Sequence, residues 1–200
     1  MIDKTYNRIH NTITTKRLNF INALSQNRIM SDSENLKILE IGCGRGEDYI
    51  EHCKSLSNLE LYGIDIFDYS IEQENFTFMK ADAKKIDFPD MYFDFVLSFG
   101  VLEHIQPIEK LSIIIKEMGR VSKSSIHVVP AVSTKFEPHS KEFLWQLKDH
   151  NKKSRRKSLN YYSDEAWLQF EGFSEFKTKR YSYIPFLVKN LIIYHIDNDK

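Results

Sequence analysis

The chain has 200 residues, of which 42% are hydrophobic, so it can bury one substantial core and we expect a single domain over residues 1–200. Lys and Arg together number 28, as do Asp and Glu, and this balance argues against nucleic acid or an anionic membrane as a partner. The two cysteines, Cys43 and Cys53, lack the further Cys or paired His of a zinc set and fit a reduced, cytoplasmic protein.

Residues 1–33 predict one or two leading helices. Apolar residues recur at helical spacings between residues 4 and 29, and the turn-forming stretch SDSEN follows them. This N-terminus lacks the continuous apolar stretch of a signal peptide, and the longest apolar stretch, YIPFLVKNLIIYHI, is interrupted by Pro185, Lys189 and Asn190. We therefore expect neither export nor a membrane span.

From residue 36 onward, short apolar strands alternate with helices. Buried strands are expected at LKILEI (36–41), LELYGID (59–65), FTFMKAD (76–82), FDFVLSF (93–99) and SIHVVP (125–130). Helices are expected from Asp48 to Leu56 and over residues 107–121. The second helix has Pro107 in its first turn and one apolar stripe, formed by Ile108, Leu111, Ile115 and Met118. The alternation predicts a doubly wound α/β fold, a parallel sheet covered by helices on both faces.

The pattern changes after Pro130. Residues 131–160 combine an irregular stretch, a short amphipathic helix and a basic run, and we interpret them as an inserted lid or substrate segment. A helix capped by Ser163 and ending near Gly172 follows them. Two final strands are expected at SEFKTKRYSYI (174–184) and LIIYHI (191–196).

The glycine loop EIGCGRGED, residues 40–48, joins the first strand to its helix, which is where ligands bind in a doubly wound sheet. Gly42, Gly44 and Gly46 permit positive φ and a close approach of a ligand to the backbone. A dinucleotide needs a third glycine at the position of Glu47, and a carboxylate there repels a pyrophosphate. S-adenosylmethionine has no phosphate and carries an ammonium and a sulfonium cation, so the acidic loop favours this cofactor.

Two acids at strand ends extend this hypothesis. Asp65 closes LYGID, a position from which a carboxylate accepts hydrogen bonds from ribose hydroxyls. Asp82 lies in ADA (81–83) after the third strand, and contact with an adenine amine and the capping of a turn are equally good interpretations. Cys43 is interpreted as a small loop filler rather than a nucleophile, because no His lies near it in the sequence.

On the motifs LEIGCGRG, GID, KADAKKIDFPDMYFDFVLSFGVLEHI and EGF, the chain resembles the class I S-adenosylmethionine-dependent methyltransferases, of the type 11 group, closely over residues 36–130 and more loosely after residue 160. The resemblance implies a mostly parallel, seven-stranded Rossmann-like sheet with helices on both faces and an antiparallel C-terminal strand. It also implies a site for S-adenosylmethionine: Glu40, Gly42, Gly44 and Gly46, with Cys43 between them, at the methionine end; Asp65, with Ile66 beside it, at the ribose; Asp82 and Ala83 at the adenine; and Phe99 beside the cofactor.

The acceptor side depends on two candidate catalytic histidines, because a hydroxyl acceptor needs a base. His104 ends the stretch LEH (102–104) at the ligand-binding edge of the sheet, where a catalytic and a structural role are equally supported. His139 lies in FEPHS (136–140), which resembles a Glu-Pro-His element of some methyltransferases of cell-surface polysaccharide synthesis; an exposed loop histidine is the alternative.

The run KKSRRK (152–157) places five cations in six residues, either as a solvated loop or as a clamp for an anionic acceptor, since Arg binds phosphate in a bidentate manner. The sequence thus predicts methyl transfer to a hydroxyl of a small molecule, with a sugar or sugar derivative as the candidate acceptor. An RNA or protein methyltransferase and a non-catalytic, cofactor-binding interaction module are the alternatives. No cluster of acids indicates a metal ion.

Overall fold

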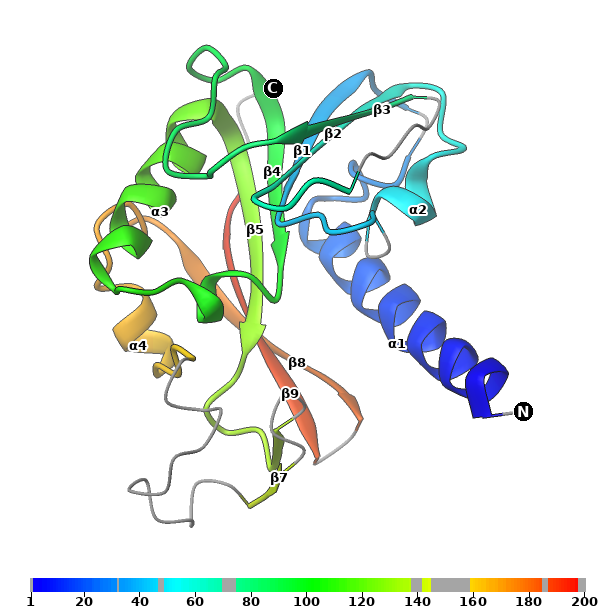
Figure 1. Ribbon diagram of the computed structural model, residues 1–200, viewed down its shortest axis with the longest axis vertical. Helices are drawn as coiled ribbons and strands as arrows, with labels where there is room; N and C mark the ends of the chain where they lie inside the picture. The colour runs from blue at the N-terminus through cyan, green and yellow to red at the C-terminus, as the bar shows by residue number, and fades with distance from the viewer. Residues whose placement is uncertain are drawn as a thin grey trace.

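The computed structural model describes residues 2–31, 33–46, 49–69, 75–137, 142–144, 159–184 and 187–197, and its centre is a seven-stranded sheet (Figure 1). Its strands are β1 (Leu36–Ile41), β2 (Leu59–Asp65), β3 (Phe76–Lys80), β4 (Phe93–Phe99), β5 (Ser122–Pro130), β8 (Lys177–Ile184) and β9 (Val188–His195). Their order is β3-β2-β1-β4-β5-β9-β8, and β9 runs antiparallel to both of its neighbours while the other pairs are parallel. The predicted fold class is confirmed.

The central strands β1 and β4 are buried along almost their whole length, which explains their continuous apolar sequences. The register pairs Ile41 of β1 with Ile64 of β2 and with Ser98 of β4, and it pairs Asp65 with Lys80 of β3. The carboxyl ends of β1, β2, β3 and β4 therefore meet at one edge of the sheet, where the loops that follow them lie side by side.

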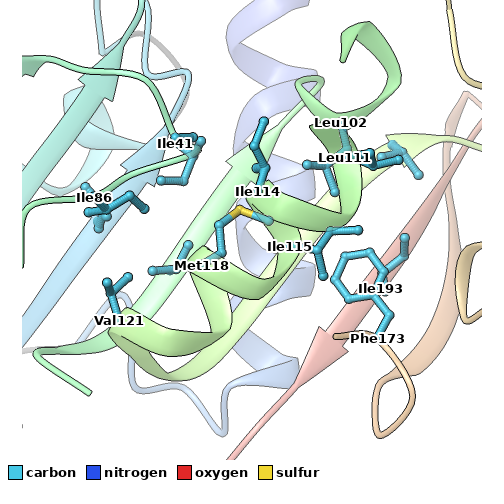
Figure 2. Close-up of a cluster of buried hydrophobic side chains, with 14 of the residues drawn as sticks. Ile41, Ile86, Leu102, Leu111, Ile114, Ile115, Met118, Val121, Phe173 and Ile193 are labelled. Atoms are coloured by element: carbon cyan, nitrogen blue, oxygen red, sulfur yellow. The ribbon is translucent and has the colours of Figure 1, made fainter. Parts of the chain in front are cut away.

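Helices cover both faces of this sheet (Figure 1). A single leading helix, α1 (Ile2–Leu24), packs on one face through the fully buried Leu18 and Ile21, together with the short helix α2 (Ile50–Cys53). On the other face lie α3 (Glu109–Val121) and α4 (Asp164–Trp167). Figure 2 shows the core beneath α3, where Leu111, Ile115 and Met118 of the predicted stripe are buried together with Ile114 and Val121, while Ile108 is only partly buried.

Two predicted helices are shorter than expected. The helix expected from Asp48 to Leu56 is confined to α2, because the N–H of Leu56 bonds to the carbonyl of Cys53 three residues back and closes a turn; Asp48 itself lies outside the described residues. The helix expected to reach Gly172 ends as α4 at Trp167, and the chain continues in turns to Gly172 at φ +101°. Trp167, Phe170 and Phe173 recur every three residues against the core, a spacing that suits tighter turns.

The boundaries around Pro107 and in the predicted insertion also differ. Helix α3 begins at Glu109, two residues after Pro107, and the three-residue 3₁₀ helix η1 (Leu102–His104) precedes it. Within residues 131–160, Phe136–Glu137 (β6) and Glu142–Phe143 (β7) pair as a two-stranded sheet, while residues 138–141 and 145–158 lie outside the described residues, so the short amphipathic helix expected in this segment stays a prediction. Across the described part of the chain, no helix has both the length and the apolar character that a bilayer crossing needs.

Candidate active site

A cavity of about 340 Å³ opens at the carboxyl edge of the sheet. Its walls are the segments that follow four neighbouring parallel strands, with one residue of α3. The lining residues are Ile41 and Gly42 at the end of β1, Ile64, Asp65, Ile66, Phe67 and Tyr69 at and after the end of β2, Ala81, Asp82 and Ala83 after β3, Gly100, Val101, His104 and Ile105 after β4, and Ile114 of α3. A crevice at this edge is where a doubly wound sheet binds its ligands.

The glycine loop is held by main-chain hydrogen bonds and leaves space for a ligand. The N–H of Gly42 bonds to the carbonyl of Ile64 at 2.8 Å, and the N–H of Gly46 bonds to the carbonyl of Cys43 at 2.7 Å. Gly42 has φ +65°, and a Cβ atom there would lie 2.6 Å from a methyl group of Val101. Gly44 has φ +52°, and a Cβ atom on it would meet nothing within 4 Å. The loop therefore needs glycine at position 42 for packing, and it is open beside Gly44.

Asp65 joins the glycine loop to the end of β2. Its Oδ2 accepts the N–H of Gly44 at 3.0 Å, and its Oδ1 accepts the N–H of Phe67 at 2.9 Å. A carboxylate offers about four lone-pair directions, so two backbone bonds leave acceptor capacity for hydroxyl groups of a ligand. Ile66, with 61% of its surface exposed, extends the same wall. The contact of Asp65 with ribose stays a prediction, and its place in the cavity wall is compatible with it.

Glu40 and Cys43 lie beside the cavity but do not line it. Along β1 the side chains alternate, and Glu40 shares the face of Ile38, which packs toward α1 and α2. Burial, followed by the charges of Glu40 and Asp65, raises the pKa of Cys43 to about 12. The thiol is therefore protonated at neutral pH. It occupies space left by Gly63, where a Cβ atom would come within 2.7 Å of the sulfur, and this favours the loop-filler interpretation.

Asp82 closes a turn and also lines the cavity, so both interpretations of it remain open. Its Oδ1 accepts the N–H of Lys84 at 3.0 Å, and its Oδ2 lies 3.0 Å from the ammonium of the same lysine. Partial burial opposes ionisation, but these two bonds outweigh it and lower the pKa of Asp82. Ala83, next to it, is buried in the core under α3 and contributes to the cavity floor.

Phe99 ends β4 on the sheet face that α1 covers, and it does not line the cavity. Its ring is 7% exposed, and the guanidinium carbon of Arg17 lies 5.0 Å from the ring centroid, within cation–π range. Helix α1 thus reaches the carboxyl edge beside the glycine loop. The sequence reasoning missed Arg17, because one cation in an amphipathic helix carries no signal of what it contacts.

On the acceptor side, His104 ends η1 and lines the cavity with an exposed side chain, whereas Glu103 is fully buried and does not line it. The candidate catalytic histidine of the LEH stretch therefore shares one cavity with Gly42, Asp65 and Asp82. His139 and the basic run 152–157 lie outside the described residues. Their roles stay predictions from the sequence.

The sequence reasoning also missed Tyr69. This residue lines the cavity four positions after Asp65, and the guanidinium carbon of Arg45, from the glycine loop, lies 5.7 Å from its ring centroid. A search for aromatic residues shortly after the strand-end acid would have found it, because the chain leaving β2 runs along the cavity.

The charge of the cavity wall separates two kinds of ligand. Among the described residues that line it are two carboxylates, Asp65 and Asp82, and no Lys or Arg. The wall itself offers a pyrophosphate no Lys or Arg, although Lys84 pairs with Asp82 and Arg45 lies over Tyr69, whereas its carboxylates would attract an ammonium or sulfonium group. The described part of the chain also contains no group of three or more His, Cys, Asp or Glu side chains that could hold a metal ion.

Comparison with known proteins gives a family and a fold. Residues 39–129 match the family model described as "Methyltransferase domain". A sterol 24-C-methyltransferase of Debaryomyces hansenii is 30% identical over 91 residues, which are 40% of this chain and 24% of that relative. The chain thus spans about a quarter of that protein's length.

Among solved structures, an S-adenosylmethionine-dependent methyltransferase from Aquifex aeolicus superposes with a TM-score of 0.55 at 15% identity, over 82% of this chain and 84% of that one. Magnesium protoporphyrin IX methyltransferase from Synechocystis, solved with bound S-adenosylmethionine, gives 0.57 at 17% identity, over 94% and 80% of the two chains. At these identities the superpositions show the fold. The family model covers residues 39–129, which is less than half of the chain, and with the superpositions it makes this chain similar to the class I S-adenosylmethionine-dependent methyltransferases.

Proposed function

We propose that the chain transfers the methyl group of S-adenosylmethionine to a hydroxyl group of a small acceptor. The observation that carries the choice of donor is the composition of the cavity wall: the described lining residues include carboxylates and no Lys or Arg, beside a glycine loop that is open at Gly44. The acceptor class that we propose is a sugar or sugar derivative. Its support is weaker and comes from the sequence around His139.

Different parts of the cavity wall would contact different parts of the cofactor. Asp65 and the backbone of the glycine loop would hold the cofactor, and the segment after β3 would border its adenine. When bound, the cofactor supplies a methyl group on a positively charged sulfur, an already activated donor. Alignment of the two reactants then contributes most of the rate, up to about 7–11 kcal/mol in well-oriented systems.

His104 is the proposed base. It lines the same cavity as Asp65 and is exposed to it, so it can accept the proton that the acceptor hydroxyl loses as its oxygen attacks the methyl carbon and the carbon–sulfur bond breaks. Proton transfer of this kind contributes typically about 10²–10⁴-fold to a rate. His139 is the second candidate for the role.

A transfer assay tests the proposal. Protein is incubated with S-adenosylmethionine labelled in its methyl group and, in separate reactions, with nucleotide-linked sugars, free and phosphorylated sugars, total RNA and an unfolded protein mixture. We expect label in a sugar-containing pool, and we expect His104→Ala to lower the rate at least about 100-fold while S-adenosylhomocysteine still binds. Label in RNA or protein, or an unchanged rate in both His104→Ala and His139→Ala, would contradict the acceptor and base assignments.

A further inference from the structure

Asn160 is a buried residue that the proposed reaction does not yet use. It is 4% exposed and ends the segment 131–160. Its backbone N–H bonds to the carbonyl of Glu103 at 2.7 Å, and its Nδ2 donates to the carbonyls of Leu102 at 3.1 Å and Ile105 at 2.8 Å. Its Oδ1 accepts a hydrogen bond from Nε2 of Gln106 at 2.6 Å. One residue thus makes four hydrogen bonds to the chain after β4, at positions 102, 103, 105 and 106.

The turn that Asn160 contacts needs such partners. A helical turn leaves its last carbonyls without partners inside the helix, and η1 has only three residues. Within the turn, the N–H of His104 bonds to Val101 at 2.9 Å and that of Ile105 bonds to Leu102 at 3.3 Å. Asn160, from more than 50 positions away, donates to the carbonyls of Glu103 and Ile105 and gives the carbonyl of Leu102 a second hydrogen bond. A side-chain amide suits this role because one nitrogen carries two donors and the oxygen accepts.

The same turn carries the acceptor side of the cavity. Val101, His104 and Ile105 line it, while Leu102 points the other way into the core, where Figure 2 shows it beside Leu111. Leu102 anchors the inner side of the turn, and Asn160 holds its carbonyls. Together the two contacts fix which way His104 faces.

Helix α4 begins shortly after Asn160. Ser163, three residues later, caps this helix through its Oγ, which accepts the N–H of Ala166 at 3.2 Å, and Trp167 is fully buried in the core. Asp164 pairs with Arg180 of β8 at 2.9 Å. Helix α4 is anchored by Trp167 and by its ion pair to β8 as well as by the Ser163 cap, so we expect it to stay in place when the cap is removed.

We infer that Asn160 is a positioning residue for methyl transfer: it holds the turn from Val101 to Ile105 so that His104 faces the acceptor in the cavity. The inference rests on the proposed function. It makes Asn160→Asp the informative change, since the new side chain has nearly the same shape but presents a carboxylate oxygen where two carbonyls now accept hydrogen bonds. Asn160→Ala removes the same donors without adding charge.

The test uses nuclear magnetic resonance on the whole chain, with and without S-adenosylhomocysteine. The readouts are amide exchange at His104 and Ile105 and the shift that the ligand causes at the His104 ring, with the Ile66 methyl groups as the reference at the cofactor end of the cavity. In both Asn160 variants we expect exchange at least about tenfold faster at the two amides. We also expect loss of the ligand-induced shift at His104 and its retention at Ile66.

Two control variants separate positioning from stability. Ser163→Ala removes the cap of α4 but no contact to the turn, so it should leave both readouts unchanged; Gln106→Ala removes one of the four bonds and should give an intermediate exchange rate. Exchange within about twofold of wild type in both Asn160 variants, or a His104 shift that persists in them, would overturn the inference. A wild-type protein that shows no shift at either Ile66 or His104 would instead overturn the proposed function.

Discussion

The glycine loop and the turn of η1 both border the cavity, but they are held in different ways. The loop is fixed by its own β-α-β unit: Gly42 bonds to the end of β2, and Gly44 bonds to Asp65, 21 positions later. The turn is fixed by Asn160, which ends the predicted insertion and is 54 to 58 positions away from its side-chain partners. We therefore expect the cofactor end of the cavity to keep its geometry when the acceptor end is changed.

We also expect the two ends to determine different properties, cofactor binding at one and the choice of acceptor at the other. The proposed cofactor end consists mainly of backbone groups and strand-end acids, which can bind the same cofactor whichever acceptor is methylated. The proposed acceptor end consists of side chains on one short turn, Val101, His104 and Ile105. Variants at the cofactor end should therefore change mainly the binding of the cofactor, and variants at the acceptor end mainly the rate of transfer.

The largest effect should follow from Asp65→Ala. The change removes a charged acceptor from the ribose position and frees Gly44, so we expect the affinity for S-adenosylhomocysteine to fall by about 3 kcal/mol or more, a factor of at least about 100. Titration calorimetry measures it. His104→Ala is the matched change at the acceptor end and should alter the affinity less than about threefold. Equal losses in the two variants would break the distinction between the ends.

Substitution of two glycines by alanine should give effects of opposite sign. Gly42→Ala forces an L residue into φ +65° and brings its Cβ within 2.6 Å of Val101, so we expect a loss of about 2 kcal/mol or more in stability and weaker ligand binding. Gly119→Ala lies within α3, where a Cβ meets nothing within 4 Å, and should stabilise by about 0.5–1 kcal/mol. Chemical denaturation checks both; destabilisation by Gly119→Ala of the same size would contradict the packing argument.

A smaller, pH-dependent effect should come from His127 on β5, which is not among the described residues that line the cavity. The residue is fully buried on β5 between Phe173 and Phe176, with Ser98 3.0 Å from its Nδ1, and burial lowers its pKa from 6.5 to about 3. Between these values the unfolded chain binds a proton that the folded chain does not, so the stability is fully present above pH 6.5 and falls as the pH falls.

As the pH falls from 6 to 4, His127 should lower the free energy of unfolding by up to about 1.4 kcal/mol per pH unit. Denaturation of the wild type and of His127→Gln over this range measures it. The variant, which keeps a polar partner for Ser98 but does not titrate, should show a correspondingly shallower dependence. Parallel pH profiles for the two proteins would show that His127 does not control acid stability.

The central strands β1, β4 and β5 could be predicted because they are short, apolar and buried on both faces, so local hydrophobicity locates them. The edge strand β3 was also located, but it was expected to be buried and only its Phe76 is. The ends of α2 and α4 could not, because short tertiary turns replace regular helix there. The pairing of β6 with β7 was also missed, since two-residue strands leave almost no periodic signal.

In the cavity, the predicted residues that lie in its wall follow strand ends: Gly42, Asp65, Ile66, Asp82, Ala83 and His104. Glu40, Cys43, Gly44, Gly46 and Phe99 lie around it without lining it. Asn160 could not be found from the sequence, because a lone asparagine gives no indication of the distant carbonyls it serves.

The roles proposed for Asp65 and His104 both depend on the proposal that the cavity binds a cationic, phosphate-free cofactor. Titration calorimetry of the wild-type protein with S-adenosylhomocysteine and with NAD, in the same buffer, tests this directly. At a concentration of about 100 times its dissociation constant, the ligand that binds should also raise the free energy of unfolding by roughly 2.7 kcal/mol, which thermal unfolding measures. We expect S-adenosylhomocysteine to bind and stabilise the protein, and NAD to do neither. Binding of NAD without binding of S-adenosylhomocysteine would contradict this proposal.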